Sequence, residues 1–363
     1  MSKKYDIGII GETIYDDYGL IASYLGLYEY IKKIGYKVVI IPPAYKKNYC
    51  KTSLSLFQSL CECGKKFKMI DYSKNNENIH TYILGCGALW DYTEHFGVDA
   101  DQISYLNFVS DDCKRISYGT TFKEEFPTLL INRPDKNDEY KTLLHKFDSI
   151  SVAAKTDVEI LKDYYDINNA ITVIDSIFLP KRDYWKNFIS NKKYNENDEI
   201  VLYPLNTVSR IETLNKTAAE LKVDTCKIAT GNPFNCQELM DKSIVLDNVE
   251  FANPPSNPMD FKKWLEKIYN CKYLMCADFY SLCFALIFSK NFIVFKNEED
   301  KRIDYLIQKM GIQDRVVENY DNEKIVKLFK TPINHKKILE KIVEYRKESM
   351  IWLVNKLKNT MKK

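Results

Sequence analysis

Short apolar runs alternate with longer amphipathic segments along most of the chain. The first run, residues 5–11 (YDIGIIG), has the length of a buried strand. Helical spacing follows over residues 18–34 and stops at Gly35, a residue type typical of helix C-termini. The next apolar run, residues 37–42, completes a strand–helix–strand unit. Such units form parallel sheets that are covered by helices.

The alternation continues in two series, which a polar segment rich in Lys and Asn, residues 187–199, separates like an exposed linker. In the first series the pattern predicts strands at residues 81–86, 115–118, 149–152 and 170–174, and helices at residues 100–109 and 156–165. In the second series it predicts strands at residues 200–204, 227–229, 244–246, 273–276 and 292–295, and helices at residues 210–221, 261–269 and 279–288. From His335 the spacing predicts one long amphipathic helix.

These patterns predict an α/β protein with two Rossmann-like, doubly wound domains. We expect the N-terminal domain at residues 1–190 and the C-terminal domain at residues 191–334. A terminal helix over residues 335–363 can pack back on the first domain. Ligands of such sheets bind outside the carboxyl ends of the strands, so the site residues are expected there.

Composition narrows the function further. Because 53 basic side chains nearly balance 50 acidic ones, for a net charge of +3, we expect no nucleic-acid partner. No apolar run is long enough for a transmembrane helix. The ten Cys include no C-x-x-C pair, which favours a reducing compartment, and we expect a cytoplasmic protein that can associate with the inner face of the membrane. No spacing of His, Cys or acidic residues predicts a metal, and we expect no cofactor.

Three strand-to-helix junctions carry candidate chemistry. Gly85, Cys86 and Gly87 follow a strand and precede Trp90, and two Gly let a backbone approach a ligand closely, although a plain tight turn without a ligand is the alternative. In the loop of residues 13–19, one of Asp16 and Asp17 suits a helix cap, and the other a base or a contact to a sugar hydroxyl.

The third junction is formed by Asp278, Tyr280 and Ser281. Asp278 suits the N-cap, and the helix terminus with Tyr280 and Ser281 suits an anion. A phosphorylated ligand also needs cations, and the candidates near predicted strand ends and later loops are Lys155, Arg210, Lys296, Arg302 and Arg315.

The order of motifs over roughly residues 6–320 resembles that of the polysaccharide pyruvyl transferase family. The family's N-Y-G loop corresponds to Asp17-Tyr18-Gly19, and its G-S-D-Q-x-W turn corresponds to residues 85–90 (GCGALW). Its K-R-I-S-Y-A-x-S-F segment is similar to residues 114–122 (KRISYGTTF), and its T-D-S-F-H-G-T-A-F-S segment to residues 276–285 (CADFYSLCFA). The order and spacing of these motifs carry the resemblance.

The resemblance implies two Rossmann-like halves in a GT-B-like arrangement and an enzyme that transfers a pyruvyl group. The donor would be phosphoenolpyruvate, and the acceptor a hydroxyl of a glycan or lipid-linked sugar, as in exopolysaccharide biosynthesis. The first domain would bind the acceptor and the second the donor. The chain can also form a homo-oligomer. The implied catalytic residues are Tyr280, Asp278 and Asp17, and the expected substrate contacts are Asp16, Tyr18, Gly85, Cys86, Gly87, Trp90, Lys155, Asn206, Ser281, Lys296 and Arg302.

The chain departs from the family pattern at two positions that the reaction uses. Tyr280 stands where the family has His, and a phenol with an unperturbed pKa of ~10 needs a special environment to move protons at neutral pH. The family's S-V-R-E segment reads Ser151-Val152-Ala153-Ala154, which leaves Lys155 as the nearest cation.

Two alternatives stay open beside the pyruvyl transferase. A GT-B-like glycosyltransferase would hold a nucleotide-activated sugar against the second domain, where the loops at residues 203–206, with Asn206, and 230–233 suit a nucleotide. A non-catalytic relative would bind a glycan without transferring a group. A compact cationic pocket would favour phosphoenolpyruvate, and a long groove in the second domain would favour a nucleotide.

Overall fold

A computed structural model describes the greater part of the 363-residue chain. The described residues are 5–12, 18–41, 79–90, 103–122, 134–189, 197–203, 208–223, 225–228, 249–251, 261–296, 300–318 and 321–360. They divide into two compact units. The first contains residues 1–15, 20–180 and 343–363, and the second contains residues 16–19 and 181–342.

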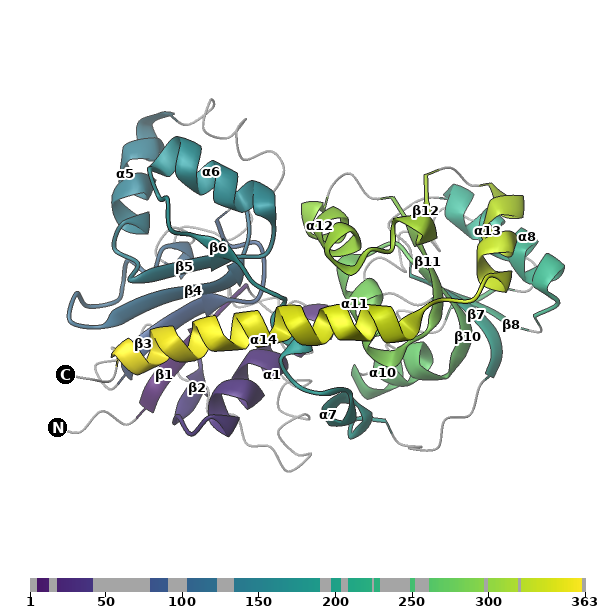
Figure 1. The fold of residues 1–363 in the computed structure, drawn as a ribbon, viewed down its shortest axis with the longest axis horizontal. Helices are drawn as coiled ribbons and strands as arrows, with labels where there is room; N and C mark the ends of the chain where they lie inside the picture. The colour runs from purple at the N-terminus through teal and green to yellow at the C-terminus, as the bar shows by residue number, and fades with distance from the viewer. Residues whose placement is uncertain are drawn as a thin grey trace. The chain divides into compact units, whose positions relative to one another are not determined.

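The first unit is built on a six-stranded parallel sheet with the order β2-β1-β3-β4-β5-β6 (Figure 1). Its strands are β1 (Tyr5–Ile10), β2 (Val38–Ile40), β3 (Ile79–Gly85), β4 (Lys114–Thr120), β5 (Ser149–Val152) and β6 (Ile171–Thr172). Its helices are most of α1 (Tyr18–Lys33), α5 (Pro134–Leu144), α6 (Lys155–Tyr165), the short η3 (Ser176–Phe178) and the later part of α14 (His335–Thr360). Side chains of α5 and α6 pack in one apolar cluster with the strands.

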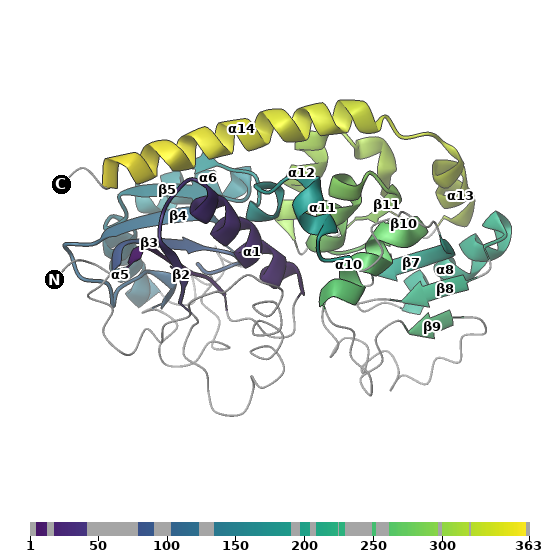
Figure 2. The same ribbon diagram turned by 90° about the horizontal axis from the view of Figure 1, so that it is seen from below.

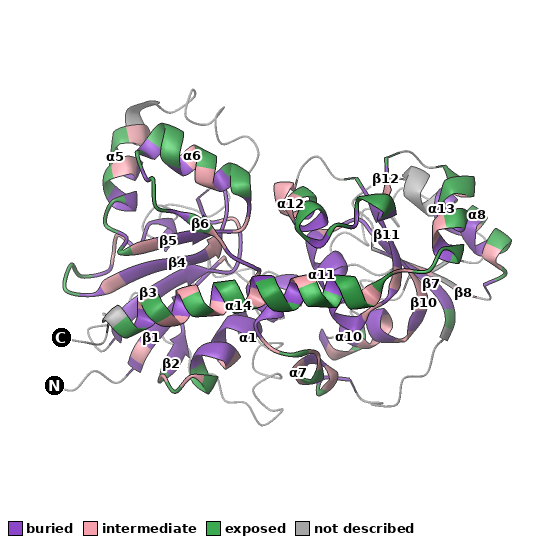
Figure 3. Cartoon of the chain, in the orientation of Figure 1, coloured by how far each residue is buried: buried purple, intermediate pink, exposed green. Residues whose placement is uncertain are grey.

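The second unit repeats this plan with a six-stranded parallel sheet in the order β12-β11-β10-β7-β8-β9 (Figure 2). Its strands are β7 (Asn197–Tyr203), β8 (Thr225–Ile228), β9 (Val249–Phe251), β10 (Cys271–Cys276), β11 (Asn291–Phe295) and β12 (Val316–Val317). Its helices are α7 (Arg182–Lys186), α8 (Val208–Leu221), α10 (Phe261–Asn270), α11 (Phe279–Phe288), α12 (Lys301–Met310), η4 (Gln313–Arg315) and α13 (Asn322–Lys330). Strands β1 and β3 of the first sheet and β10 and β11 of the second are largely buried, as parallel strands covered on both faces should be (Figure 3).

The α/β class with two Rossmann-like units is confirmed, but some predicted elements differ. The helix expected at residues 100–109 is wrong in its later half: residues 103 and 104 are helical, but residues 105–108 form turns and Leu106 has a φ of 51°. The Arg115 side chain of β4 binds the carbonyl oxygens of Leu106 and Val109 and holds these turns beside the sheet. The end of the expected linker is also wrong, because β7 already begins at Asn197. The strand expected at residues 244–246 lies outside the described residues.

Helix α14 packs on the first unit through its later residues. Ser349 accepts a hydrogen bond from the backbone N–H of Ile174 at 2.9 Å. The ring of Trp352 lies 6.4 Å from that of Tyr118 on β4. Every third or fourth residue of the helix is buried, from Ile338 to Leu357, so the amphipathic pattern of the sequence describes this helix well.

The division between the units falls after Pro180, earlier than the expected boundary at residue 190. Helix α7 belongs to the second unit because its aromatic side chain packs there. Trp185 is fully buried, and its ring lies 5.2 Å from Phe284 of α11 and 6.1 Å from Phe188.

Trp185→Ala should lower the free energy of unfolding by about 3–5 kcal/mol, because it leaves a large cavity among aromatic rings. Urea denaturation of the full chain measures this change. The matched control is Tyr164→Ala on α6, where 46% of the side chain is exposed and the effect should be small. Equal losses for the two variants would contradict the assignment of α7 to the core of the second unit.

Candidate functional site

The second unit holds a strand-to-helix junction that is capped by a carboxylate. Strand β10 ends at Cys276 and helix α11 begins at Phe279, so Asp278 occupies the N-cap position. Its side chain accepts hydrogen bonds from the backbone N–H groups of Tyr280 at 3.0 Å and Ser281 at 2.9 Å. The capping role predicted for Asp278 is therefore confirmed.

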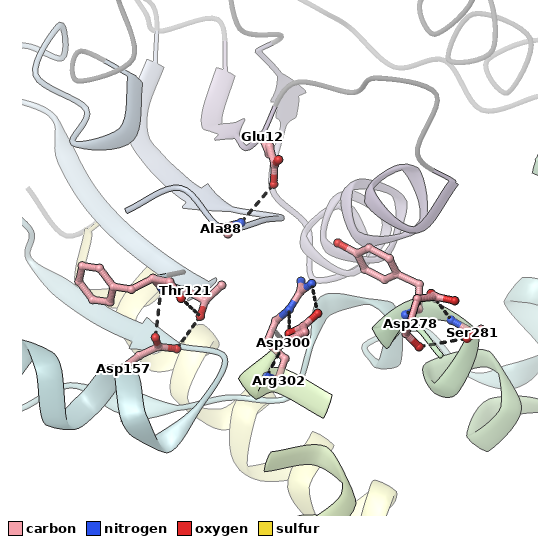
Figure 4. A network of polar contacts seen from close by, with 10 residues as sticks. Glu12, Ala88, Thr121, Asp157, Asp278, Ser281, Asp300 and Arg302 are labelled. Carbon is pink, nitrogen blue, oxygen red and sulfur yellow. Dashed lines mark hydrogen bonds and ion pairs between the residues drawn. The ribbon is translucent and has the colours of Figure 1, made fainter. Parts of the chain in front are cut away.

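This cap fills the helix terminus that we expected to receive a ligand anion. The first N–H groups of α11 already bind the chain's own carboxylate (Figure 4). The hydroxyl of Ser281, which is fully buried, donates to the Asp278 carbonyl oxygen at 3.0 Å. Burial raises the pKa of Asp278, hydrogen bonds from Ser281 and Tyr280 offset part of this rise, and the charge of Asp300 adds to it. The ligand contact expected from Ser281 stays a prediction.

A guanidinium group lies beside the same junction. Asp300 caps helix α12 and accepts hydrogen bonds from Nε of Arg302 at 2.8 Å and from a terminal nitrogen at 2.7 Å. The central carbon of the guanidinium lies 4.4 Å from the ring centre of Phe279 and 5.4 Å from that of Tyr280. Guanidinium groups stack on aromatic rings and bind carboxylates at two points. The structure therefore brings together Arg302 and Tyr280, two of the residues predicted from sequence.

Arg302 is a permanent cation that solvent still reaches. Burial lowers its pKa, but the charge of Asp300 and the hydroxyl of Tyr280 outweigh this effect, and the pKa lies well above the ordinary value. The Arg302 side chain keeps 17% of its surface exposed, and that of Asp300 keeps 20%. A ligand that approaches Tyr280 can therefore meet both charges.

Gly19 fixes the place of the Tyr280 ring. Gly19 belongs to the second unit, and a Cβ atom added there would lie 1.9 Å from Cδ2 of Tyr280. Only Gly allows this approach without displacement of the ring. The neighbouring Tyr18 is buried, and its ring centre lies 5.8 Å from that of Trp264 on α10. The predicted loop residues Tyr18 and Gly19 thus pack against the second unit.

The Gly-Cys-Gly turn of the first unit closes around an acidic residue that the sequence reading missed. The backbone N–H of Glu12 donates to the Cys86 carbonyl at 2.9 Å, and its carboxylate accepts from the N–H of Ala88 at 3.2 Å (Figure 4). A Cβ atom at Gly87, where φ is 126°, would lie 2.4 Å from a carboxylate oxygen of Glu12. The signal in the sequence was an acidic residue directly after the Gly that ends the first strand.

Two residues of this turn are less accessible than expected for substrate contacts. Trp90 is fully buried, and its indole nitrogen donates to the Ser104 carbonyl at 3.1 Å. Its ring packs 5.1 Å from Phe122. Cys86 is 4% exposed. Burial raises the pKa of its thiol well above the ordinary value, and the charge of Asp175 adds to this effect.

A second missed carboxylate ties the end of β4 to the start of α6. Asp157 is fully buried and accepts hydrogen bonds from the Thr121 hydroxyl at 2.8 Å and the Phe122 N–H at 3.1 Å. It also accepts from the N–H of Ala154 at 3.1 Å, which completes a helix cap. The signal in the sequence was the position of Asp157, an acidic residue three positions after Ala154, which is the spacing of a helix cap.

Lys155, the expected substitute cation, does not join this buried network. Its side chain is 76% exposed, and its Nζ lies 3.9 Å from a carboxylate oxygen of Glu159, one helical turn along α6. Lys296 is also exposed, directly after β11. Arg315 binds backbone carbonyls at the start of β11, away from the carboxyl ends. The side chain of Arg210 and the whole of Asp16, Asp17 and Asn206 lie outside the described residues.

Comparisons with known proteins give a family and a fold. The family model described as polysaccharide pyruvyl transferase matches residues 21–299. No protein with a curated description matches the sequence. No helix in the described ranges is both long and apolar enough to cross a membrane.

The solved structures that resemble the chain are distant in sequence. A glycosyltransferase from Rickettsia africae ESF-5 is 10% identical with a TM-score of 0.56, and the alignment covers 99% of both chains. A UDP-N-acetylglucosamine 2-epimerase from Rickettsia bellii is 11% identical with a TM-score of 0.56, and the alignment covers 98% of this chain and 97% of that one. The trehalose 6-phosphate synthase of Burkholderia multivorans is 8% identical with a TM-score of 0.56 and 99% coverage of both. These similarities confirm the GT-B-like fold.

Two substitutions of Asp278 should have different effects on stability. Asp278→Asn keeps the capping oxygen and removes a buried charge, whereas Asp278→Ala removes the cap and should cost about 1 kcal/mol. Because the folded pKa of Asp278 is raised, the native state holds more protons than the unfolded state above the ordinary pKa of 3.8. The wild type therefore loses stability as the pH rises through the folded pKa, and Asp278→Asn should be relatively most stable at neutral pH.

Urea unfolding at pH 7 and pH 4 measures this difference. We expect the Asn variant to equal or exceed the wild type at pH 7 and to lose that advantage at pH 4. If Asn costs as much as Ala at pH 7, the capping account of Asp278 is wrong.

Proposed function

Because this chain belongs to the polysaccharide pyruvyl transferase family, we propose that it transfers a pyruvyl group from phosphoenolpyruvate to a sugar of a cell-surface glycan or its precursor. The reaction would take place at the junction that holds Tyr280. One observation carries this proposal. The accessible guanidinium of Arg302 lies beside the ring of Tyr280, at the position where family members have His.

The reaction needs groups that this junction contains. Two sugar oxygens form bonds to C2 of phosphoenolpyruvate, the methylene carbon gains a proton to become a methyl group, and the bond to the phosphate oxygen breaks. Of the two protons that leave the hydroxyls, one balances the new methyl group and the other leaves with inorganic phosphate. A general acid and a cation are therefore required.

Tyr280 suits the general acid, and Arg302 suits the cation. After a phenol has donated its proton, a guanidinium nearby stabilises the phenolate by Coulomb attraction. The same cation can bind the carboxylate or phosphate of the donor through its exposed side. Asp300 holds the guanidinium at two points, so the cation is already in place before the ligand arrives. Asp17 remains our proposed base for the sugar hydroxyl.

A second candidate is a glycan-binding protein without transferase activity, and the local charge balance favours it. The Asp300 carboxylate already pairs with the Arg302 guanidinium at 2.7 Å, and the Asp278 carboxylate lies at the same junction. A balanced site suits a neutral sugar better than a multiply charged donor. The two candidates therefore differ in whether phosphoenolpyruvate binds.

Thermal-shift titration should separate the candidates. We expect phosphoenolpyruvate to stabilise the wild type by about 2.7 kcal/mol at a hundredfold excess over Kd. Arg302→Met should lose most of this effect because it removes the cation beside Tyr280. Lys309→Gln, at the exposed end of the same helix, is the matched control and should keep it. Stabilisation by a neutral glycan alone would favour the binding protein. Stabilisation by UDP-sugars alone would indicate a glycosyltransferase that uses a nucleotide-activated sugar in place of phosphoenolpyruvate.

Tyr280→Phe should reduce turnover by at least about a hundredfold, because it removes the acid while the ring and its packing stay. Phosphate release from phosphoenolpyruvate, with cell-envelope glycan as acceptor, measures the rate. Donor affinity should stay within a few-fold of the wild type, and Tyr164→Phe in the first unit serves as the control. An unchanged rate would exclude Tyr280 as the proton donor.

A further inference from the structure

Four basic side chains from four segments of the second unit lie near the end of the second sheet at which its strands begin. Arg182 is the first residue of α7, Lys290 precedes β11, Arg315 lies in η4 and His335 begins α14. Tyr280 follows the carboxyl end of β10, and β10 and β11 are parallel, so this group lies at the opposite edge of the sheet. The reaction proposed above uses none of these four residues.

The acceptors that hold these cations are backbone carbonyls at helix ends. Lys290 is 4% exposed, and its Nζ donates to the Tyr269 carbonyl in the last turn of α10 at 3.0 Å. A terminal nitrogen of Arg182 donates to the carbonyl of Phe288, the last residue of α11, at 2.8 Å.

Arg315 follows the same pattern. It is 2% exposed and donates to the Leu328 carbonyl in the last turn of α13 at 2.7 Å, as well as to the Phe292 carbonyl. A helix C-terminus carries only about half a negative charge. Three helix ends therefore offset these three cations only in part.

The lowered pKa of His335 reflects the positive charge that the helix ends leave uncompensated. Burial lowers the pKa of this imidazole, and the charges of Arg315, Arg182 and Lys290 lower it further. The acidic neighbours of Arg182 and Arg315 in sequence, Asp183 and Asp314, are exposed, and neither is among the groups that act on His335, although Asp314 acts on Arg315. On its own helix the next charged side chains are lysines 336 and 337, which are exposed.

One donor in this group has no acceptor. The Nε atom of Arg182 is buried and makes no hydrogen bond with any residue that the structure describes. A buried donor is normally paired, and an unpaired one calls for an explanation such as a bound ion. The first turn of α14 adds the positive end of a 26-residue helix, with Asn334 as its cap.

We propose that Arg182, Lys290 and His335, with Arg315 behind them, form a binding site for a phosphate-type oxyanion. An oxyanion accepts from Nε of Arg182 and neutralises the clustered charge. Phosphate as a free ion and phosphate in a lipid headgroup share this chemistry. The site is separate from the one at Tyr280 and does not depend on the function proposed there.

Histidine NMR tests this site with inorganic phosphate as the probe. The chain has only four His, so the signal of His335 can be followed separately from those of His80, His95 and His145. Bound phosphate offsets the cations, so the pKa of His335 should rise with phosphate and not with sodium chloride at equal ionic strength. The other three His should show no such rise.

Variants locate the effect. Arg182→Gln should weaken phosphate binding at least about tenfold, because it removes a charged hydrogen bond. Arg346→Gln is the matched control, since it removes the same charge from α14 at about 16 Å along the helix from His335. Tyr280→Phe should leave the phosphate response intact, which separates this site from the proposed transferase.

Two results would overturn the proposal, one from the wild type and one from the variants. If sodium chloride raises the pKa of His335 as much as phosphate does, the response is screening and no site exists. If Arg182→Gln and Arg346→Gln respond alike, Arg182 is not part of a site. Vesicles of phosphatidylglycerol show whether the bound phosphate group is a free ion or a lipid headgroup. If the pKa of His335 reaches its plateau at a lower concentration of lipid phosphate than of free phosphate, the site binds a lipid headgroup.

Discussion

Carboxylates that bind backbone N–H groups hold the ends of the parallel strands in both units. Asp278 caps α11, Asp300 caps α12, and Asp157 ties the start of α6 to the segment after β4. In the first unit Glu12 does the same for the turn after β3. The carboxyl ends of the strands are where proteins of this class bind ligands. The chain's own acidic residues therefore decide which backbone donors remain for a substrate.

This constraint changes how a donor anion can be held. In the second unit Asp278 already binds two N–H groups in the first turn of α11, so we expect side chains to meet most of the donor's charge. Arg302 is suited to this task because Asp300 and two aromatic rings fix its position. The motif resemblance places Tyr280 and Ala153 where the family has His and Arg, and in our proposal the Arg302–Tyr280 pair compensates for both changes.

The sequence predicted the parallel sheets well, because buried strands and their Gly-terminated helices leave a local pattern. It failed where the deciding contact is long-range. Residues 105–108 have helical spacing, but they form turns, and the Arg115 side chain of β4 binds the Leu106 and Val109 carbonyls there. Lys155 stood near a lost Arg in the sequence, yet the turn of α6 directs it to solvent. The cap that Asp157 forms has a local signal, but its bonds to residues more than thirty positions away have none.

A crystal structure with phosphoenolpyruvate bound would test the central claim most directly. The account predicts electron density for the donor within hydrogen-bond distance of the Tyr280 hydroxyl and of the exposed side of Arg302. Density at the carboxyl end of β10 would also place the methylene carbon relative to the proposed acid. Density only at Arg182 and His335, or none at all at saturating donor, would contradict the assignment of Tyr280 and Arg302 to the donor site.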